Sequence, residues 1–441
     1  MVVTEHSNTN FSIDISPLQD AIRKVNIIVP AAVVYKLYKH FALTQQHTIS
    51  AYGFHKRILP FEYIDQNYRT TVLKHIREFL LRYCVSSFLD QRLRELKIVV
   101  AARPKLTNIN IDKDLNMFFE FDIISTVKIP DLQDWRYLLF RPSQRKNYKD
   151  LDKQATLFIS TEHKNEQLYK AQYGTSALVQ PDDWVCFAIT LIDAQQQAVI
   201  DHKEQLWFKI SNEEDALPYR EVFLNQKIGA KFSSNASCLQ DFFNKNIDTR
   251  YDFEIEIIDI IPNSYFSLDA FQRHFKLKTK KKGHQKLIEV FSSKNDLSLH
   301  RNIVEELFEL CFNHHKIPAP LTAVAEQKNV ILNSLIDSAD YPVYRMQSGF
   351  EAQIENLAHK QVRETILIDS LAYLEDIQVG HDDVRNYLNL AQRARTKEFI
   401  YFKHPAIIAN VHEYPTSDLE LRQHCLREKT LNHVINYLSE R

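Results

Sequence analysis

Glycine is scarce in this sequence, with six residues among 441. Phosphate-binding loops and dinucleotide fingerprints need several glycines close together, because their turns require positive φ and close backbone approach to the ligand. The six glycines are scattered, at positions 53, 174, 229, 283, 349 and 380, so nucleotide-dependent enzymes of these kinds are excluded. Only three methionines are present, which excludes an adaptable methionine-rich binding surface.

The sequence also lacks patterns typical of disulfide frameworks, metal sites and membrane-spanning segments. The five cysteines are far apart and form no C-x-x-C pair, which favours reduced thiols over a disulfide or zinc framework. The 18 histidines, His314 and His315 included, show no H-E-x-x-H spacing, so no metal site is predicted. No apolar run approaches the ~20 residues that cross a bilayer, and no secretory leader is recognisable. We expect a cytoplasmic protein.

Net charge is nearly absent, since 55 basic and 56 acidic residues give −1. The charge is unevenly distributed: residues 1–128 hold 17 basic and 12 acidic side chains, or +5, and the remainder hold 38 and 44, or −6. A basic front half suits an anionic partner, although ordinary variation of the surface also explains this split.

Hydrophobic patterning predicts an α+β, multidomain chain of ordinary globular composition. The first unit, residues 1–130, combines strand-like alternation at 10–16 and 117–129 with a long helix over 61–96. Residues 131–180 are polar and helix-leaning, which is typical of a connector. Residues 181–261 contain three strand-like runs, WVCFAITLI, QLWFKI and YDFEIEIIDII, and predict a small antiparallel domain. Residues 262–441 are predicted to be helical.

The segment 52–60, YGFHKRILP, lies between two predicted helices. A glycine, an exposed phenylalanine, consecutive cations and a closing proline suit a loop that docks on a phosphate backbone or an acidic protein surface. A plain helix–helix connector would look similar. The candidate docking residues are Gly53, Phe54, His55, Lys56, Arg57 and Pro60.

The order of the units and this loop resemble the trigger factor family, the ribosome-associated bacterial chaperones, over essentially the whole chain. The family's docking signature reads Gly-Phe-Arg-x-Gly-x-x-Pro, and Gly53, Phe54 and Pro60 match it. His55 replaces the arginine, and Arg57 replaces the second glycine. The segments 313–321 and 353–378 are similar to the family's entry into an arm helix and to the helix that follows.

The resemblance implies that residues 181–261 form an FKBP-type domain, which in this family isomerises X-Pro bonds. Such catalysis needs an apolar, aromatic pocket and no nucleophile. Carrying the family pattern over gives four pocket candidates, Asp201, Phe208, Leu217 and Phe253. Arg220 falls where an aromatic floor is expected, and a charge there is costly. We therefore expect a retained fold with a degenerate pocket.

The resemblance also implies that the helices after residue 262 form a cradle for unfolded chains. The candidate client-binding residues are Ile317, Leu321, Phe399, Tyr401, Phe402 and Ile407. Each of them also fits an ordinary core position. A lysine-rich run at 276–286 would suit an RNA contact or a solvated helix face.

Three functional hypotheses follow from the resemblance. The first is an ATP-independent chaperone that docks beside the ribosomal exit tunnel and shields nascent polypeptides. The second is an active prolyl isomerase, and the third is a free chaperone that has lost ribosome docking. The implied partners are the ribosome and unfolded polypeptides, with no membrane and no cofactor, and a homodimer off the ribosome would fit the family.

Overall fold

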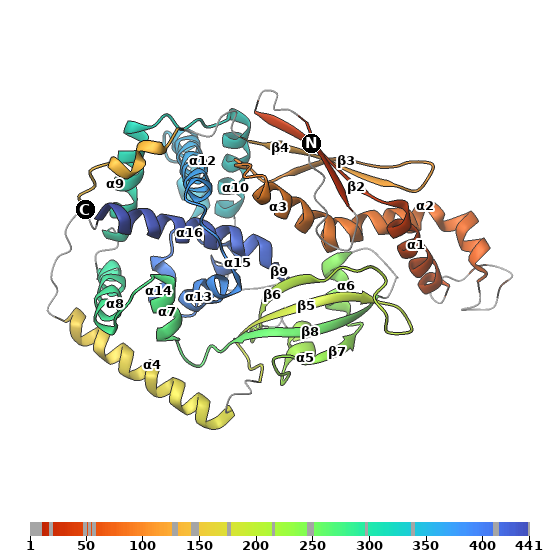
Figure 1. Cartoon of the computed structure of the whole chain (residues 1–441), viewed down its shortest axis with the longest axis horizontal. Helices are drawn as coiled ribbons and strands as arrows, with labels where there is room; N and C mark the ends of the chain where they lie inside the picture. Colours follow the sequence, from red (N-terminus) through yellow and green to blue (C-terminus); the bar gives the residue numbers. More distant parts are fainter. Residues whose placement is uncertain are drawn as a thin grey trace.

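The computed structural model describes residues 11–16, 21–46, 51, 54, 59–125, 131–142, 150–173, 178–213, 217–244, 251–295, 299–336, 340–408 and 414–439. Within these ranges helices and antiparallel sheets are combined in several packed units (Figure 1). The predicted α+β, multidomain class is therefore confirmed. None of the helices in these ranges is both long and apolar enough to cross a membrane.

The first unit pairs a four-stranded antiparallel sheet, in the order β1-β2-β4-β3, with helices on one face. Its elements are β1 (Ser12–Ile15), β2 (Ile22–Val29), α1 (Ala31–Gln45), α2 (Phe61–Leu80), the π-helical turn η1 (Leu81–Val85), α3 (Ser86–Glu95), β3 (Lys105–Ile111) and β4 (Met117–Ile124). Pro30 and Pro60 immediately precede α1 and α2, where a missing N–H costs nothing. The strands predicted near 10–16 and 117–129 and the long helix predicted at 61–96 are confirmed.

The second unit is a five-stranded antiparallel sheet in the order β7-β8-β5-β6-β9. Its elements are β5 (Trp184–Ile192), β6 (Glu204–Lys209), α5 (Leu217–Phe223), β7 (Lys231–Ser234), α6 (Ser237–Phe243), β8 (Asp252–Ile261) and β9 (Thr416–Ser417). The three predicted strands are β5, β6 and β8. The edge strand β9 comes from near the end of the chain, more than 150 residues after β8, and was not predicted.

Both faces of this second sheet are covered. All nine residues of β5 are buried. Phe187 and Ile189 face a core shared with the first unit, and Trp184 and Cys186 face a core shared with the C-terminal helices. Figure 1 shows α2 and α3 running between the two sheets, with the C-terminal helices at the side of the second sheet.

The remaining chain is helical apart from β9. The connector contributes a 3-10 turn, η2 (Gln133–Tyr137), and a long helix, α4 (Leu151–Tyr173), which packs along α8. The C-terminal helices are α7 (Leu268–His274), α8 (Lys280–Asn295), α9 (Leu299–His314), α10 (Leu321–Ile336), α11 (Tyr341–Arg345), α12 (Phe350–Leu374), α13 (His381–Ala391), α14 (Ala394–Phe399), α15 (Pro405–Ile408) and α16 (Asp418–Ser439).

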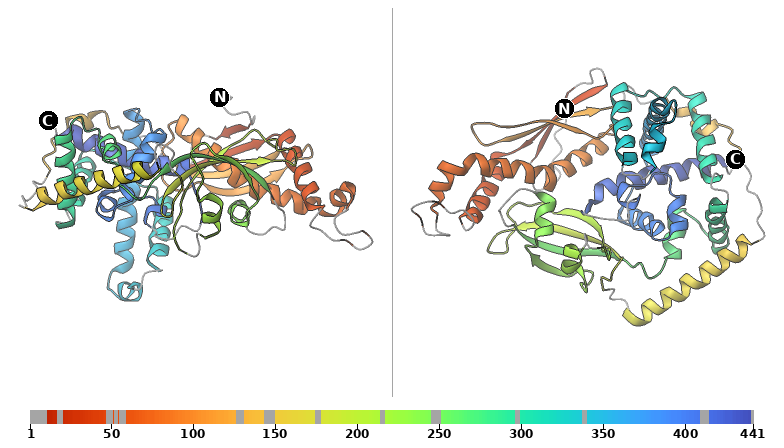
Figure 2. Two further views of the ribbon diagram at one scale, coloured as in Figure 1. Left: turned by 90° about the horizontal axis from the view of Figure 1, so that it is seen from below. Right: turned by 180° about the vertical axis from the view of Figure 1, so that it is seen from behind.

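Two of these helices form an arm. α10 packs along α12, and in the left view of Figure 2 the pair extends well away from the rest of the molecule. The buried cores do not follow the boundaries expected at residues 130, 180 and 261, because each of the three cores joins residues from two or more of the expected units. The boundaries themselves stay predictions.

Candidate functional site

The expected docking loop lies between α1 and α2 in the chain, and both helices lie on the side of the molecule away from the C-terminal helices (Figure 1). Phe54 is 40% exposed, and its ring centroid lies 5.0 Å from that of Tyr63 on α2. Pro60 is the residue before α2. Gly53, His55, Lys56 and Arg57 lie outside the described residues, so their docking role stays a prediction.

The four isomerase candidates do not converge on one pocket. Phe208 and Phe253 are both fully buried, the first with its ring 4.5 Å from that of Tyr219 and the second 5.3 Å from that of Phe243. Asp201 is exposed, and so is Leu217 at 38%. Phe208 and Phe253 thus pack against other rings of the protein's own core, and their role in a prolyl pocket stays a prediction.

Arg220 does not lie in an apolar pocket, contrary to the expectation from the family pattern. Its guanidinium donates a hydrogen bond to Asn212 Oδ1 at 3.2 Å, in an exposed position. The neighbouring Tyr219 turns inward instead, and its hydroxyl donates to the Cys238 carbonyl at 2.8 Å. The helix α5 is oriented so that the aromatic residue is buried and the cation is solvated, which avoids the cost of a buried charge.

A residue of the first unit occupies part of this core. Tyr83, in the π-helical turn, donates its hydroxyl to the His202 carbonyl at 2.8 Å and accepts from the Leu191 N–H at 3.0 Å. Burial raises its pKa well above the usual value for tyrosine. A π-helical turn redirects one side chain from an otherwise regular helix, and here it fixes the first unit to strand β5.

Most of the expected client-binding residues are not on the surface. Ile317, Phe399 and Ile407 are core residues with at most 6% of their area exposed, so the alternative interpretation as core positions holds for them. Tyr401 and Phe402 are partly buried. Leu321, at 84% exposed, is the one that faces solvent.

Two buried carboxyl groups hold the segment that carries Tyr401 and Phe402. The Tyr401 hydroxyl donates to Glu364 Oε2 at 3.0 Å, and the backbone N–H groups of Tyr401 and Phe402 donate to Glu428 Oε2 at 3.1 and 3.0 Å. Burial raises the pKa of both Glu364 and Glu428 to about 7. The segment is thus part of the framework of the C-terminal unit.

An exposed apolar surface that the sequence did not single out lies at the end of the arm. We call it the arm tip, and it consists of Ile336, Val343, Tyr344 and Met346, which are 53, 63, 41 and 86% exposed. Ile336 ends α10, and the other three lie on or just after α11. The signal for it is the apolar run YPVYRM at 341–346, too short and irregular to form a core helix.

Catalytic and metal-binding groups are few. Among the described residues no group of three His, Cys, Asp or Glu side chains is arranged to hold a metal ion. All five cysteines are buried, and burial raises the pKa of the Cys311 thiol to about 12, so that thiol is not a nucleophile at neutral pH.

Comparison with known proteins gives one family match. Residues 12–155 match the model of the bacterial trigger factor protein. No curated protein sequence matches the chain. Among solved structures, the chain resembles one described under "Promiscuous Substrate Recognition in Folding and Assembly Activities of the Trigger Factor Chaperone", with 13% identity and a TM-score of 0.37 over 96% of this chain and 100% of the other.

Proposed function

We propose that this chain, whose residues 12–155 match the model of the bacterial trigger factor protein, is a chaperone that binds unfolded polypeptides without ATP. The single observation that carries the proposal, beyond the family match, is the arm tip on a projecting helix pair. Exposed apolar side chains grouped on one projection are typical of interaction sites, because burying them against a partner removes them from water.

The arm tip replaces the buried candidates as the proposed client-binding surface. Val343 and Met346 contribute apolar area that is free in this conformation, whereas Ile317, Phe399 and Ile407 would have to leave a packed core first. Extracting such a side chain costs about 1.5–3 kcal/mol, which is too much for weak and frequent binding of many clients.

Ribosome docking through the α1–α2 loop is the finer part of the proposal. Its support is the match of Gly53, Phe54 and Pro60 to the family's signature, the half-exposed ring of Phe54, and the +5 charge of residues 1–128. Cations on such a loop would neutralise phosphate groups of ribosomal RNA, which makes binding salt-dependent. We place the protein in the cytoplasm on the same argument.

Prolyl isomerase activity is not part of the proposal. Phe208 and Phe253 each pack against other rings of the same core. The corresponding test is refolding of a protein limited by proline isomerisation. We expect no acceleration by the wild-type chain, and an acceleration that Phe253→Ala abolishes would contradict this.

The chaperone proposal is tested by aggregation of a chemically unfolded client in the presence of the wild type and of Val343→Ser/Met346→Ser. We expect the variant to suppress aggregation several-fold less, because serine removes most of the apolar area of the arm tip. The matched control is Leu157→Ser, which alters a 68% exposed leucine on α4. The role of the arm tip would be contradicted if both variants lost the same amount of aggregation suppression, or if neither variant lost any.

The docking proposal is tested separately by co-sedimentation with ribosomes at low and moderate salt. We expect binding by the wild type that weakens with salt and is lost in Phe54→Ala/His55→Ala/Lys56→Ala. Equal or absent binding in both proteins would leave a free chaperone, the third hypothesis.

A further inference from the structure

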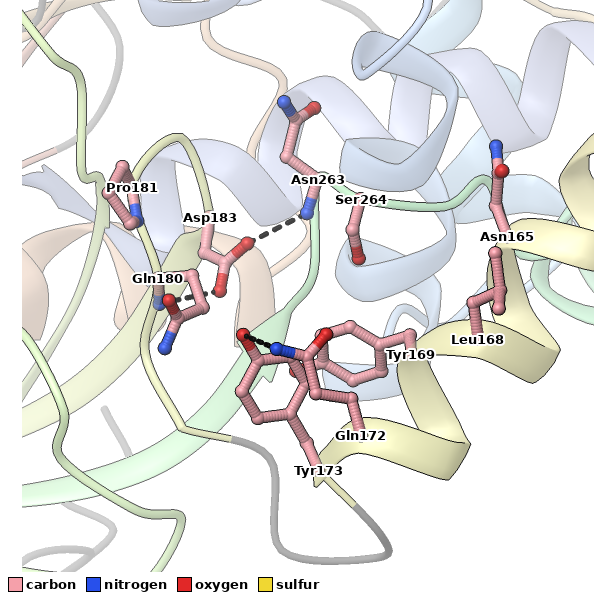
Figure 3. Close-up of a pocket in the computed structure, with 10 residues that line it drawn as sticks. All are labelled: Asn165, Leu168, Tyr169, Gln172, Tyr173, Gln180, Pro181, Asp183, Asn263 and Ser264. Carbon is pink, nitrogen blue, oxygen red and sulfur yellow. Dashed lines mark hydrogen bonds between the residues drawn. The ribbon is translucent and has the colours of Figure 1, made fainter.

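The cavity at the C-terminal end of α4 carries its charge on a group that is already paired (Figure 3). It has a volume of about 410 Å³ and is lined by residues of α4 and of the segments before β5 and after β8. Asp183 is 2% exposed, and its two carboxylate oxygens accept the backbone N–H groups of Gln180 and Asn263 at 2.9 and 2.8 Å. Unpaired charge lies instead on α8, the helix that packs along α4.

The surface formed by the end of α7 and the start of α8 is strongly basic. Residues 270–288 hold seven Lys and Arg side chains and no Asp or Glu. One of the seven, Lys286, is paired, with its Nζ 2.7 Å from an oxygen of Glu289. The other six are exposed and form no ion pair with any described residue. We call them the basic patch: Arg273, Lys276, Lys278, Lys280, Lys281 and Lys282.

Close packing of α7 and α8 brings these charges together. A Cβ atom at Gly283 of α8 would lie 3.0 Å from Nε2 of Gln272 on α7, so the missing side chain lets the two helices approach. The N–H of Leu277 donates to the Gln272 carbonyl at 2.9 Å, which ends α7 with a tight turn. The first turn of α8, with its three lysines, therefore lies beside the last turn of α7 and the segment that follows it.

The stability of α8 does not explain the lysines at its start. Lys280, Lys281 and Lys282 occupy its first turn, which contains no acidic residue. The N-terminus of a helix carries a partial positive charge, so cations there are unfavourable. Like charges on neighbouring residues also repel one another. A polyanion bound to the basic patch would remove both costs.

The lack of exposed apolar groups decides which kind of polyanion fits this surface. Within the described range 270–288 no large apolar side chain is exposed, and Phe271 and Phe275 are 1% and 3% exposed. A membrane-surface helix presents apolar residues beside its lysines, and the centre of a protein interface is depleted in lysine. Single-stranded nucleic acid binds exposed aromatic rings by base stacking. The phosphate backbone of a duplex needs only cations.

We propose that the basic patch binds the phosphate backbone of duplex RNA, without reading its sequence. The choice of RNA over DNA rests on the proposed function, because that function brings the chain to the ribosome. The basic patch belongs to the C-terminal helices, whereas α1 and α2, which flank the docking loop, lie on the other side of the molecule (Figure 1). The basic patch is therefore a second RNA contact, which works without the loop.

The test measures binding of a short, fluorescein-labelled RNA duplex to the full chain by fluorescence anisotropy, at salt concentrations between about 50 and 200 mM. The proteins are the wild type, the patch variant Lys280→Gln/Lys281→Gln/Lys282→Gln and the control Lys113→Gln/Lys164→Gln/Lys227→Gln. The control removes three exposed lysines from scattered places, so both variants have the same net charge. The N–H of residue 282 still donates to Thr279 Oγ1 in the patch variant, as it does at 3.2 Å in the wild type, and folding is preserved.

We expect the wild type to lose affinity about 10³-fold between 50 and 200 mM salt, because six neutralised phosphates give a slope of about −5 in log K against log salt. The patch variant keeps three of the six cations. It should bind more weakly at 50 mM and lose only about 40-fold over the same range. The control should behave like the wild type.

Four results would overturn the inference. They are no binding of the RNA duplex by the wild type, equal weakening in the patch variant and the control, displacement of the RNA by polyglutamate as readily as by unlabelled RNA, and tighter binding of a DNA duplex of the same length. The loop variant Phe54→Ala/His55→Ala/Lys56→Ala should bind the RNA duplex like the wild type, and a loss there would assign the binding to the loop instead. Co-sedimentation with ribosomes at moderate salt, where the basic patch binds weakly, tests the docking loop separately, so failure of either proposal is recognised by itself.

Discussion

The two sheets of this protein are built from similar strands but are covered differently. In the first sheet, β4 alternates between buried residues such as Phe119 and partly buried ones such as Phe118. In the second sheet, every residue of β5 is buried, because Tyr83 of the first unit, α5 and α6 cover one face and C-terminal helices cover the other. Substitutions on a sheet face that is only partly buried should therefore cost less stability than substitutions in a sheet covered on both faces.

The second sheet therefore serves as the structural centre of the molecule. Tyr83 enters it from one side, and the Trp207 indole N–H donates to Asp418 Oδ1 of α16 at 2.9 Å on the other.

The largest expected loss of stability appears when one phenylalanine from each sheet is replaced by alanine. Phe187→Ala in β5 removes a fully buried ring that lies 4.6 Å from the ring of Phe223, and should lower the free energy of unfolding by about 3–5 kcal/mol. Phe118→Ala in β4 should cost less, about 1–2 kcal/mol, since this ring is only partly buried. Urea denaturation of both variants measures the difference, and equal costs would contradict the comparison.

A pH experiment tests the helices that cover the second sheet. His274 of α7 is buried with Nε2 unpaired, and burial lowers its pKa to about 4. The folded state therefore favours the neutral imidazole. Burial of the neutral His274 imidazole contributes its full stability above pH 6.5, the usual histidine pKa of an unfolded chain. This stability is lost as the pH falls toward 4.

Lowering the pH from 8 to 5 should thus cost about 2 kcal/mol at this one residue. His274→Leu should reduce the pH dependence of the urea midpoint by that amount. His163→Leu, an exposed histidine on α4, is the control and should leave it unchanged. A pH dependence identical in His274→Leu and the wild type would show that the imidazole is not kept neutral by burial.

Breaking the contact between the first unit and β5 should change the free energy of unfolding by less than Phe187→Ala does. Tyr83→Phe leaves the N–H of Leu191 without its acceptor and should cost about 1–2 kcal/mol. Amide hydrogen exchange at Leu191 should accelerate while exchange in β4 stays the same. Unchanged protection at Leu191 would mean that another group satisfies this N–H.

The smallest change in the free energy of unfolding is expected for a substitution on the arm, which belongs to neither sheet. Val343→Ser changes a 63% exposed side chain and should alter the free energy of unfolding by less than about 0.5 kcal/mol, although it weakens client binding. A large loss of stability in the urea experiment would show that the arm tip packs against the body.

The sequence predicted the elements with strong patterns and missed those without them. The continuous apolar run of β5 and the alternation of β4 were both recognisable as strands. A continuous apolar run is also typical of a strand that is buried on both faces, as β5 is. β3, with the sequence KLTNINI, has mostly exposed residues and little apolar signal. β9 is two residues long and depends on a partner in a distant part of the chain.

The candidate site was harder to predict than the fold. Phe208 and Phe253 have the same residue type whether they line an open pocket or fill a core, and a sequence does not show which neighbours close the space. Arg220 was expected in the pocket because of its position in a family pattern. It is one residue beyond the buried Tyr219 on α5, and this next position faces solvent.

The order in which the chain is made gives α16 a particular importance. Its Leu421 and Cys425 complete one core, its Leu431 and Val434 complete another, and β9 immediately before it closes an edge of the second sheet. During synthesis, which proceeds at roughly 5–20 residues per second, the face of β5 toward the C-terminal helices and the inner sides of several helices stay uncovered until α16 has been made. A protein proposed to guard nascent chains therefore exposes apolar surface of its own while it is being synthesised.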